Sequence, residues 1–198
     1  MPTFTYTNFD CYVSQTFFVI KSERINQKYL TAILNSQVIA FWLRYKGKMQ
    51  GDLFQVDKAP ILEIPIYKAP EPECKAIEIL VDYILHLTAA LKDIPSHGEK
   101  LMVAADDKLM LSYFEQIVDA VVMELYLPEE LHAGEKYFMR HLLQENLPSL
   151  DQLKGDKIAA LREIFRRLFD REHPIRVNIY FLYSLEVVQI VGARRENY

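Results

Sequence analysis

Residues 29–66, YLTAILNSQVIAFWLRYKGKMQGDLFQVDKAPILEIPI, decide how the first part of this chain folds, because three patterns follow one another there without a gap. The first is the spacing of an amphipathic helix, with apolar positions at Leu30, Ile33, Leu34, Ile39, Trp42 and Leu43. The second is a basic loop with glycines over residues 44–52, and the third is a short β-like run that ends at residues 64–66. The loop is the part that can meet a phosphate backbone.

Around this stretch the sequence predicts one interrupted helix and three strands. The helix covers residues 26–45, and Asn35-Ser36 is expected to break it, with Ser36 capping the second half by accepting a bond from an exposed N–H group. Gly47 suits the left-handed position that ends a helix. The strands are predicted over residues 15–20, 53–56 and 61–66.

A boundary near residue 70 is marked by Pro65, Pro70 and Pro72, since prolines cannot lie together inside a helix or a central strand. The balance of charge changes at the same place. Residues 1–70 carry eight Lys and Arg against five acids, which leaves 15 against 22 for the rest of the chain. We therefore expect two domains, residues 1–70 and residues 71–198.

Beyond the boundary the apolar residues follow helical spacing. Acids near the start of the first helix stand where the helix dipole favours them. Residues 175–191 remain ambiguous, because their β-branched end fits a strand and their beginning fits a helix. The expected class is α+β, predominantly α, with a small α/β lobe followed by a helical domain. The predicted helices cover residues 73–91, 99–127, 136–145 and 155–171.

Four pieces of the first part occur together, in the same order, in a known family. The pieces are Gln15-Thr16-Phe17-Phe18-Val19-Ile20, Tyr29-Leu30 with Leu34-Asn35-Ser36, Gly47 to Gly51 with Phe54-Gln55-Val56, and Leu62-Glu63-Ile64-Pro65-Ile66. With them, about a third of the chain resembles the C-terminal specificity domain of TaqI-like adenine-specific DNA methyltransferases and type IIG restriction–modification enzymes. The target-recognition domains of type I specificity subunits are akin to it. The resemblance implies that residues 1–70 are a partial target-recognition lobe of a bacterial restriction–modification protein, which recognises DNA rather than modifying it.

Such a lobe needs cations that hold phosphates and amide side chains that read base edges in the major groove. The basic loop offers three cations, one amide that suits adenine, and two glycines that let the backbone approach closely. One more lysine follows the loop. The alternative is an ordinary solvated helix end, where the dipole favours cations in any case. The candidate DNA-binding residues are Arg44, Lys46, Gly47, Lys48, Gln50, Gly51 and Lys58.

No catalytic residue is predicted. A methyltransferase of this class needs a Gly-rich turn for the methyl donor and an Asn/Asp-Pro-Pro-Tyr/Phe motif for the target adenine, and the chain has neither. Glu73-Cys74-Lys75 matches the end of a metal-dependent nuclease motif, with Asp52 or Asp57 upstream, but Glu73 is expected to open a helix rather than lie on a strand. None of the five histidines pairs at i, i+4, so no metal site is expected.

These absences predict a chain that is not itself an enzyme and needs no cofactor, and its expected partners are double-stranded DNA and a catalytic methyltransferase domain or subunit. There is no run of about 18 uncharged apolar residues and no signal peptide, so no membrane partner is expected and the predicted location is cytoplasmic. Two isolated cysteines fit neither a disulfide framework nor a zinc site.

Two functions stay open. In the first, the chain is the non-catalytic DNA target-recognition portion of a restriction–modification adenine methyltransferase, as a C-terminal fragment or subunit, with more strand sequence expected upstream of residue 15. In the second, it is a helical protein-interaction or assembly module, and the basic loop is only surface. The acidic helical half could pack as an extension, act as a spacer or dock another domain. Trp42 is expected to be buried, since it lies near Ile39 on the apolar face.

Overall fold

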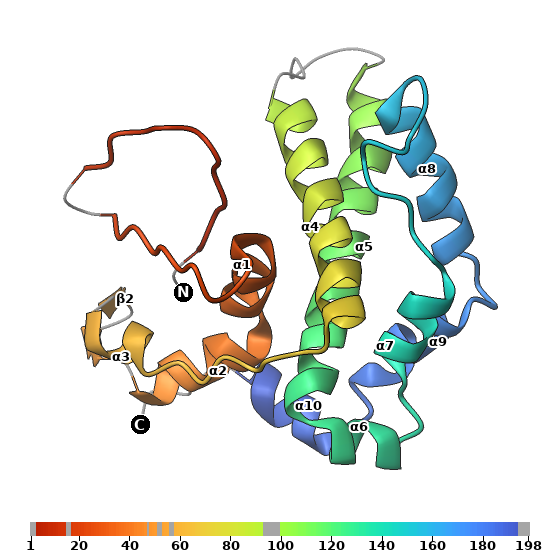
Figure 1. The fold of residues 1–198 in the computed structure, drawn as a ribbon. Helices are drawn as coiled ribbons and strands as arrows, with labels where there is room; N and C mark the ends of the chain where they lie inside the picture. Colours follow the sequence, from red (N-terminus) through yellow and green to blue (C-terminus); the bar gives the residue numbers. More distant parts are fainter. Residues whose placement is uncertain are drawn as a thin grey trace.

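The computed structural model describes residues 3–14, 17–46, 48–50, 53–55, 58–92 and 100–193, with side chains described for all of these except residues 48–50, 53–55 and 100–104. The described part is predominantly helical, as the sequence predicts (Figure 1). Its two strands are β1 (Lys48–Gln50) and β2 (Leu53–Gln55). Its helices are α1 (Gln27–Asn35), α2 (Gln37–Lys46), α3 (Lys58–Leu62), α4 (Glu71–Lys92), α5 (Lys100–Tyr126), α6 (Pro128–Ala133), α7 (Phe138–Gln144), α8 (Lys157–Leu168), α9 (Pro174–Leu182) and α10 (Glu186–Gly192).

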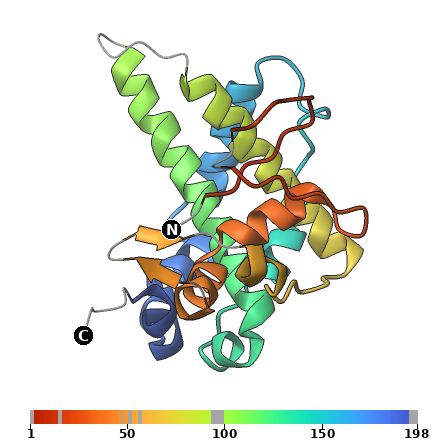
Figure 2. The same cartoon turned by 90° about the vertical axis from the view of Figure 1, so that its left-hand side faces the viewer.

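The long helices α4 and α5 form the centre of the molecule. They lie side by side, with α1 and α2 against one side and α7, α8 and α9 towards the other (Figures 1 and 2). Tyr83 of α4 and Phe114 of α5 are both fully buried, and their ring centres are 5.6 Å apart. Leu30 and Ile33 of α1 belong to the same hydrophobic cluster. Because apolar burial is the main favourable term in folding, this shared core holds α1 to the central pair.

Ser36 separates α1 from α2. Its hydroxyl donates to the carbonyl of Ile33 at 2.7 Å and accepts from the N–H of Ile39 at 3.3 Å. The break and the capping role predicted for Ser36 are therefore confirmed. Asp119 of α5 accepts a second bond at this end of α2, from the N–H of Gln37 at 2.7 Å. The first turn of α2 thus has partners for N–H groups that a helix leaves unsatisfied.

Carboxylates on α5 also fix the short helices α7 and α8. Glu124 accepts hydrogen bonds from the N–H groups of Phe138 at 2.8 Å and Met139 at 2.6 Å, the first two residues of α7. Asp107 accepts two bonds from the guanidinium of Arg162 on α8, at 2.8 and 2.9 Å. Bonds of this kind involve a charged partner and are stronger than those between neutral groups. Together with apolar packing, these bonds hold α7 and α8 against the central pair.

The predicted α/β lobe is wrong. Described residues 17–20 are irregular rather than a strand, and residues 61–66 contain the end of α3 and an irregular segment. A strand must pair its N–H and C=O groups with a neighbour, and Pro65 has no N–H to offer, so the apolar pattern of these segments did not suffice to build a sheet. A strand does occur within predicted residues 53–56, but β2 pairs with β1 in a short hairpin.

Trp42 is only partly buried, contrary to the prediction. Ile39 and Leu43, which are four residues apart on α2, are 0% and 1% exposed. Residues at this spacing lie on one face of a helix, and Trp42 lies beside that face rather than on it. The indole therefore packs along the edge of the core.

The C-terminal segment, which the pattern left ambiguous, is helical, with α9 and α10 separated by residues 183–185. None of the described helices alone has the length and apolar composition to cross a membrane. Helices α9 and α10, bent by 71° relative to each other, meet both criteria only when they are taken together.

Candidate nucleic-acid interface

The predicted basic loop becomes the passage from α2 into a β-hairpin. Helix α2 ends at Lys46, and the hairpin is drawn at the edge of the molecule in Figure 2. Gly47 and Gly51 lie outside the described residues, so the roles expected for them stay predictions. The antiparallel register pairs Lys48 with Gln55, Met49 with Phe54, and Gln50 with Leu53.

Arg44 is engaged inside the fold. Its guanidinium donates a hydrogen bond to the carbonyl oxygen of Val191 in α10, and it lies 5.9 Å from the centre of the Phe41 ring. The side chain is half-buried. Arg44 therefore joins α2 to α10, and a phosphate contact by this residue would have to compete with that bond.

Lys46 is exposed in the last turn of α2, where the helix dipole favours a cation. Beside it, Tyr45 is 61% exposed, and its ring centre lies 4.7 Å from that of Phe41. Lys48 and Gln50 occupy alternate positions of β1. Of the predicted DNA-binding residues, Lys46, Lys48 and Gln50 thus fall in one short segment at the end of α2 and the start of the hairpin.

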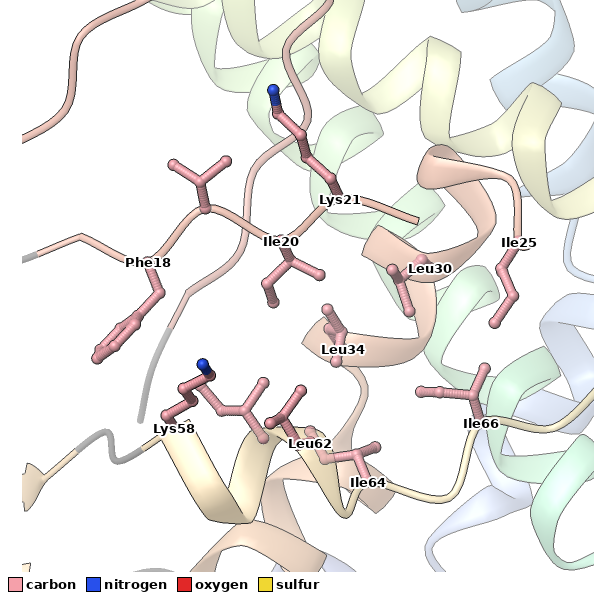
Figure 3. Close-up of a pocket in the computed structure, with 12 residues that line it drawn as sticks. Phe18, Ile20, Lys21, Ile25, Leu30, Leu34, Lys58, Leu62, Ile64 and Ile66 are labelled. Atoms are coloured by element: carbon pink, nitrogen blue, oxygen red, sulfur yellow. The ribbon is translucent and has the colours of Figure 1, made fainter. Parts of the chain in front are cut away.

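A groove of about 320 Å³ lies next to α3, the helix that follows the hairpin. Its walls are residues 18–21, α1, α3 and residues 64–66 (Figure 3). Lys58, the last of the predicted DNA-binding residues, is exposed and lines this groove from the start of α3. The groove was not predicted from the sequence. Its apolar lining residues include members of the two segments, residues 15–20 and 61–66, for which strands were predicted.

Tyrosine side chains hold the wall of the groove at residues 64–66. The Tyr126 hydroxyl of α5 donates to the carbonyl of Pro65 at 2.6 Å and accepts from the N–H of Tyr67 at 3.1 Å. The Tyr29 hydroxyl of α1 donates to the carbonyl of Tyr67 at 2.8 Å. Burial raises the pKa of both Tyr29 and Tyr126, which disfavours loss of the protons that these hydroxyls donate. This wall is therefore bonded to helices of the core.

The nuclease-like triplet at residues 73–75 has no strand geometry, because Glu73 lies in the first turn of α4. Burial, with the charge of Glu124 nearby, raises the pKa of Glu73. Lys75 lies 3.9 Å from Glu78. In the described part of the chain, no group of three His, Cys, Asp or Glu is placed to hold a metal ion. Asp52 and Asp57, the upstream partners considered for the triplet, lie outside the described residues.

Comparison with known proteins bears on the first third of the chain. No curated protein and no solved structure matches the chain significantly. The residues that line the groove, and the positions of α1 and the hairpin, all fall within residues 1–66. Residues 1–66 match the family model of the TaqI-like C-terminal specificity domain, which confirms the resemblance seen in the sequence.

Proposed function

We propose that this chain is the DNA target-recognition portion of a restriction–modification adenine methyltransferase and is itself non-catalytic. The observation that carries the proposal is the match of residues 1–66 to a specificity domain. A catalytic methyltransferase domain or subunit would then supply the chemistry, and double-stranded DNA would be the second partner. In this proposal residues 1–70 recognise DNA, and residues 71–198 support them.

The contact element in this proposal is the end of α2 together with the hairpin. A two-stranded β-ribbon fits the major groove of DNA, where an amide side chain can form two hydrogen bonds with adenine. Lys46 and Lys48 are assigned to phosphates, and Gln50 to a base edge. Alternate positions of a strand share a face, so the register of β1 is compatible with Lys48 and Gln50 acting on the same side of the ribbon.

The two other predicted cations take different roles. Arg44 is assigned to positioning, because its bond to Val191 fastens α2 to α10 just before the hairpin begins. Lys58 is assigned to the groove that it lines. The proposed DNA contacts are therefore Lys46, Lys48 and Gln50, with Gly47 and Gly51 allowing close approach of the backbone.

The test is duplex DNA binding by the 198-residue chain, measured by fluorescence anisotropy at several salt concentrations. A preferred duplex is first selected from random sequences. The double variant Lys46→Ala/Lys48→Ala should weaken binding to all duplexes and reduce the slope of log K against log salt by about 2. Gln50→Ala should lose roughly 1–3 kcal/mol on the selected duplex and little on a random one.

Lys108→Ala provides the matched control, because Lys108 is an exposed lysine on α5. It should leave the salt slope unchanged. If the double lysine variant keeps the wild-type affinity and slope, the DNA role of the hairpin is wrong. The second candidate function, a protein-interaction module without DNA contact, would then be preferred, and the exposed apolar groove is the observation that favours it.

A further inference from the structure

The groove combines an apolar interior with two cations. Ten of its twelve lining residues are apolar. Figure 3 shows Leu30 and Leu34 of α1 on one side of the space, and Leu62 and Ile64 on the side of α3. Such a surface binds a ligand that offers apolar groups for burial.

The two cations that line the groove are Lys21 and Lys58, and Figure 3 shows Lys58 beside the apolar space and Lys21 at its opposite edge, with its ammonium group directed away from that space. Both are exposed, and neither forms an ion pair with a described residue. Lys28, only seven residues after Lys21, has its ammonium group 2.6 Å from Asp82. Within the described part of the chain, Lys21 and Lys58 therefore have no carboxylate partner, whereas Lys28 is paired with Asp82.

The rim of the groove is too exposed for a small molecule to cover. Phe18 is 54%, Val19 is 61% and Leu62 is 72% exposed. Small-molecule sites enclose about 70–90% of a ligand's surface, and apolar residues that project from an open rim would stay in water beside such a ligand. Exposed apolar patches of this kind mark surfaces that another protein covers.

The backbone of residues 18–21 runs along one side of the groove. Residues 18–21 are irregular, and their N–H and C=O groups make no hydrogen bond with another described residue. An extended peptide can pair with such groups by lying alongside, and the side chains of the peptide then enter neighbouring pockets. Main-chain pairing and apolar burial are therefore available to the same occupant.

We propose that the groove binds an extended segment of another protein in which apolar side chains lie next to carboxylates. The apolar side chains enter between α1 and α3, and the carboxylates pair with Lys21 and Lys58. Successive side chains of an extended segment point to opposite faces, so alternate apolar residues enter the groove together. This site goes beyond DNA recognition, because it needs neither the hairpin nor a nucleic acid.

The experiment uses the 198-residue chain as bait for a displayed library of random peptides of about 12 residues. The enriched peptides should share at least two apolar positions with an adjacent Asp or Glu. The affinity of one enriched peptide, made with a fluorescent label, is then measured by anisotropy. Leu62→Asp should weaken its binding by about tenfold or more, since it places a charge on the apolar rim. Lys21→Glu and Lys58→Glu should each weaken it several-fold and make it less sensitive to salt.

Two variants on α5 serve as matched controls. Leu109→Asp adds a charge at another exposed leucine, and Lys108→Glu reverses an exposed lysine, so both should leave peptide affinity unchanged. Because Leu62 is 72% exposed, the Leu62→Asp variant should keep the wild-type circular dichroism spectrum and melting temperature. Lys46→Ala/Lys48→Ala should also bind the peptide normally, which separates this proposal from the DNA role of the hairpin.

The proposal is overturned if no peptide is enriched, if the enriched peptides lack carboxylates, or if Leu62→Asp binds them as well as the wild type. Displacement of the labelled peptide by duplex DNA would assign the groove to nucleic acid instead. A dimer in sedimentation that Leu62→Asp dissociates would assign the groove to a second copy of this chain.

Discussion

The central helices bury most of their large apolar side chains, whereas several in the leading segment, described residues 3–14 and 17–25, are exposed. Phe114 and Ile117 of α5 are fully buried, whereas Phe9 is 70% and Phe17 is 67% exposed. Buried apolar side chains stabilise a fold, and exposed ones that lie together mark a surface that binds something. The family match falls on residues 1–66, which include this segment. In the function proposed above, α4 and α5 would act as a scaffold, and the first third would present the surfaces for recognition.

The largest expected effect comes from comparing substitutions of two phenylalanines, one in α5 and one in the leading segment. Phe114→Ala removes a fully buried ring that packs on Tyr83, and it should lower the free energy of unfolding by about 3–5 kcal/mol. Phe18→Ala removes a ring that is 54% exposed, and it should change stability by less than about 1 kcal/mol. Urea unfolding of both variants provides the measurement. Equal losses would mean that the leading segment is part of the core after all.

A second test asks whether α2 and α5 are joined as one unit through Asp119. Burial raises the pKa of Asp119 to about 6 from its ordinary 3.8, although the hydrogen bonds from Gln37 act in the opposite direction. The folded protein therefore holds this proton more tightly than the unfolded chain. Stability linked to Asp119 is fully present below about pH 4 and is lost as the pH rises through about 6.

Asp119→Asn keeps an oxygen acceptor for the N–H of Gln37 but has no charge to bury. The stability of the variant should not depend on the titration of residue 119. The difference in the free energy of unfolding between the wild type and the variant should therefore change by up to about 3 kcal/mol between about pH 4 and pH 7. Urea unfolding across this range is the measurement. Parallel curves for the two proteins would show that the folded protein does not hold the proton of Asp119 more tightly than the unfolded chain does.

A smaller effect is expected at Trp42, at the border of the two regions. Because the indole is only partly buried, Trp42→Ala should cost about 1–2 kcal/mol, less than a fully buried aromatic side chain. Leu43→Ala, one residue further, removes a side chain that is 1% exposed and should cost about 2–4 kcal/mol. Thermal unfolding of both variants measures the difference. A reversed order would place the indole, and not Leu43, in the core.

The sequence predicted the parts of the fold that depend on local pattern. Helical spacing located α4, α5 and α8. The polar pair at Asn35-Ser36 located the break between α1 and α2, because a serine next to a helix start can cap it through a bond to a residue only three positions away. Short helix α6 was not predicted. Described residues 17–20 and 61–66, where strands were predicted and are absent, show the limit of such reasoning, since a strand depends on a partner that can lie anywhere in the chain.

The features of the candidate site also divide into those that the local sequence predicted and those that depend on contacts between distant residues. The basic composition of residues 44–58 was visible in the sequence, but the bond from Arg44 to Val191 was not, because it joins residues far apart in the chain. The groove was also invisible as a site, since its walls come from four separate segments. A pattern can locate charges, whereas only the packed fold shows which of them already have partners.

The claim that the first third recognises DNA through the hairpin is tested most directly by a crosslink from position 50. The variant Gln50→p-benzoylphenylalanine is irradiated with the selected duplex at low salt, beside a control variant with the same substitution at Lys108 of α5. We predict a covalent adduct with DNA from position 50 and none above background from position 108. No adduct from position 50, or equal adducts from both positions, would contradict the proposed role of the hairpin.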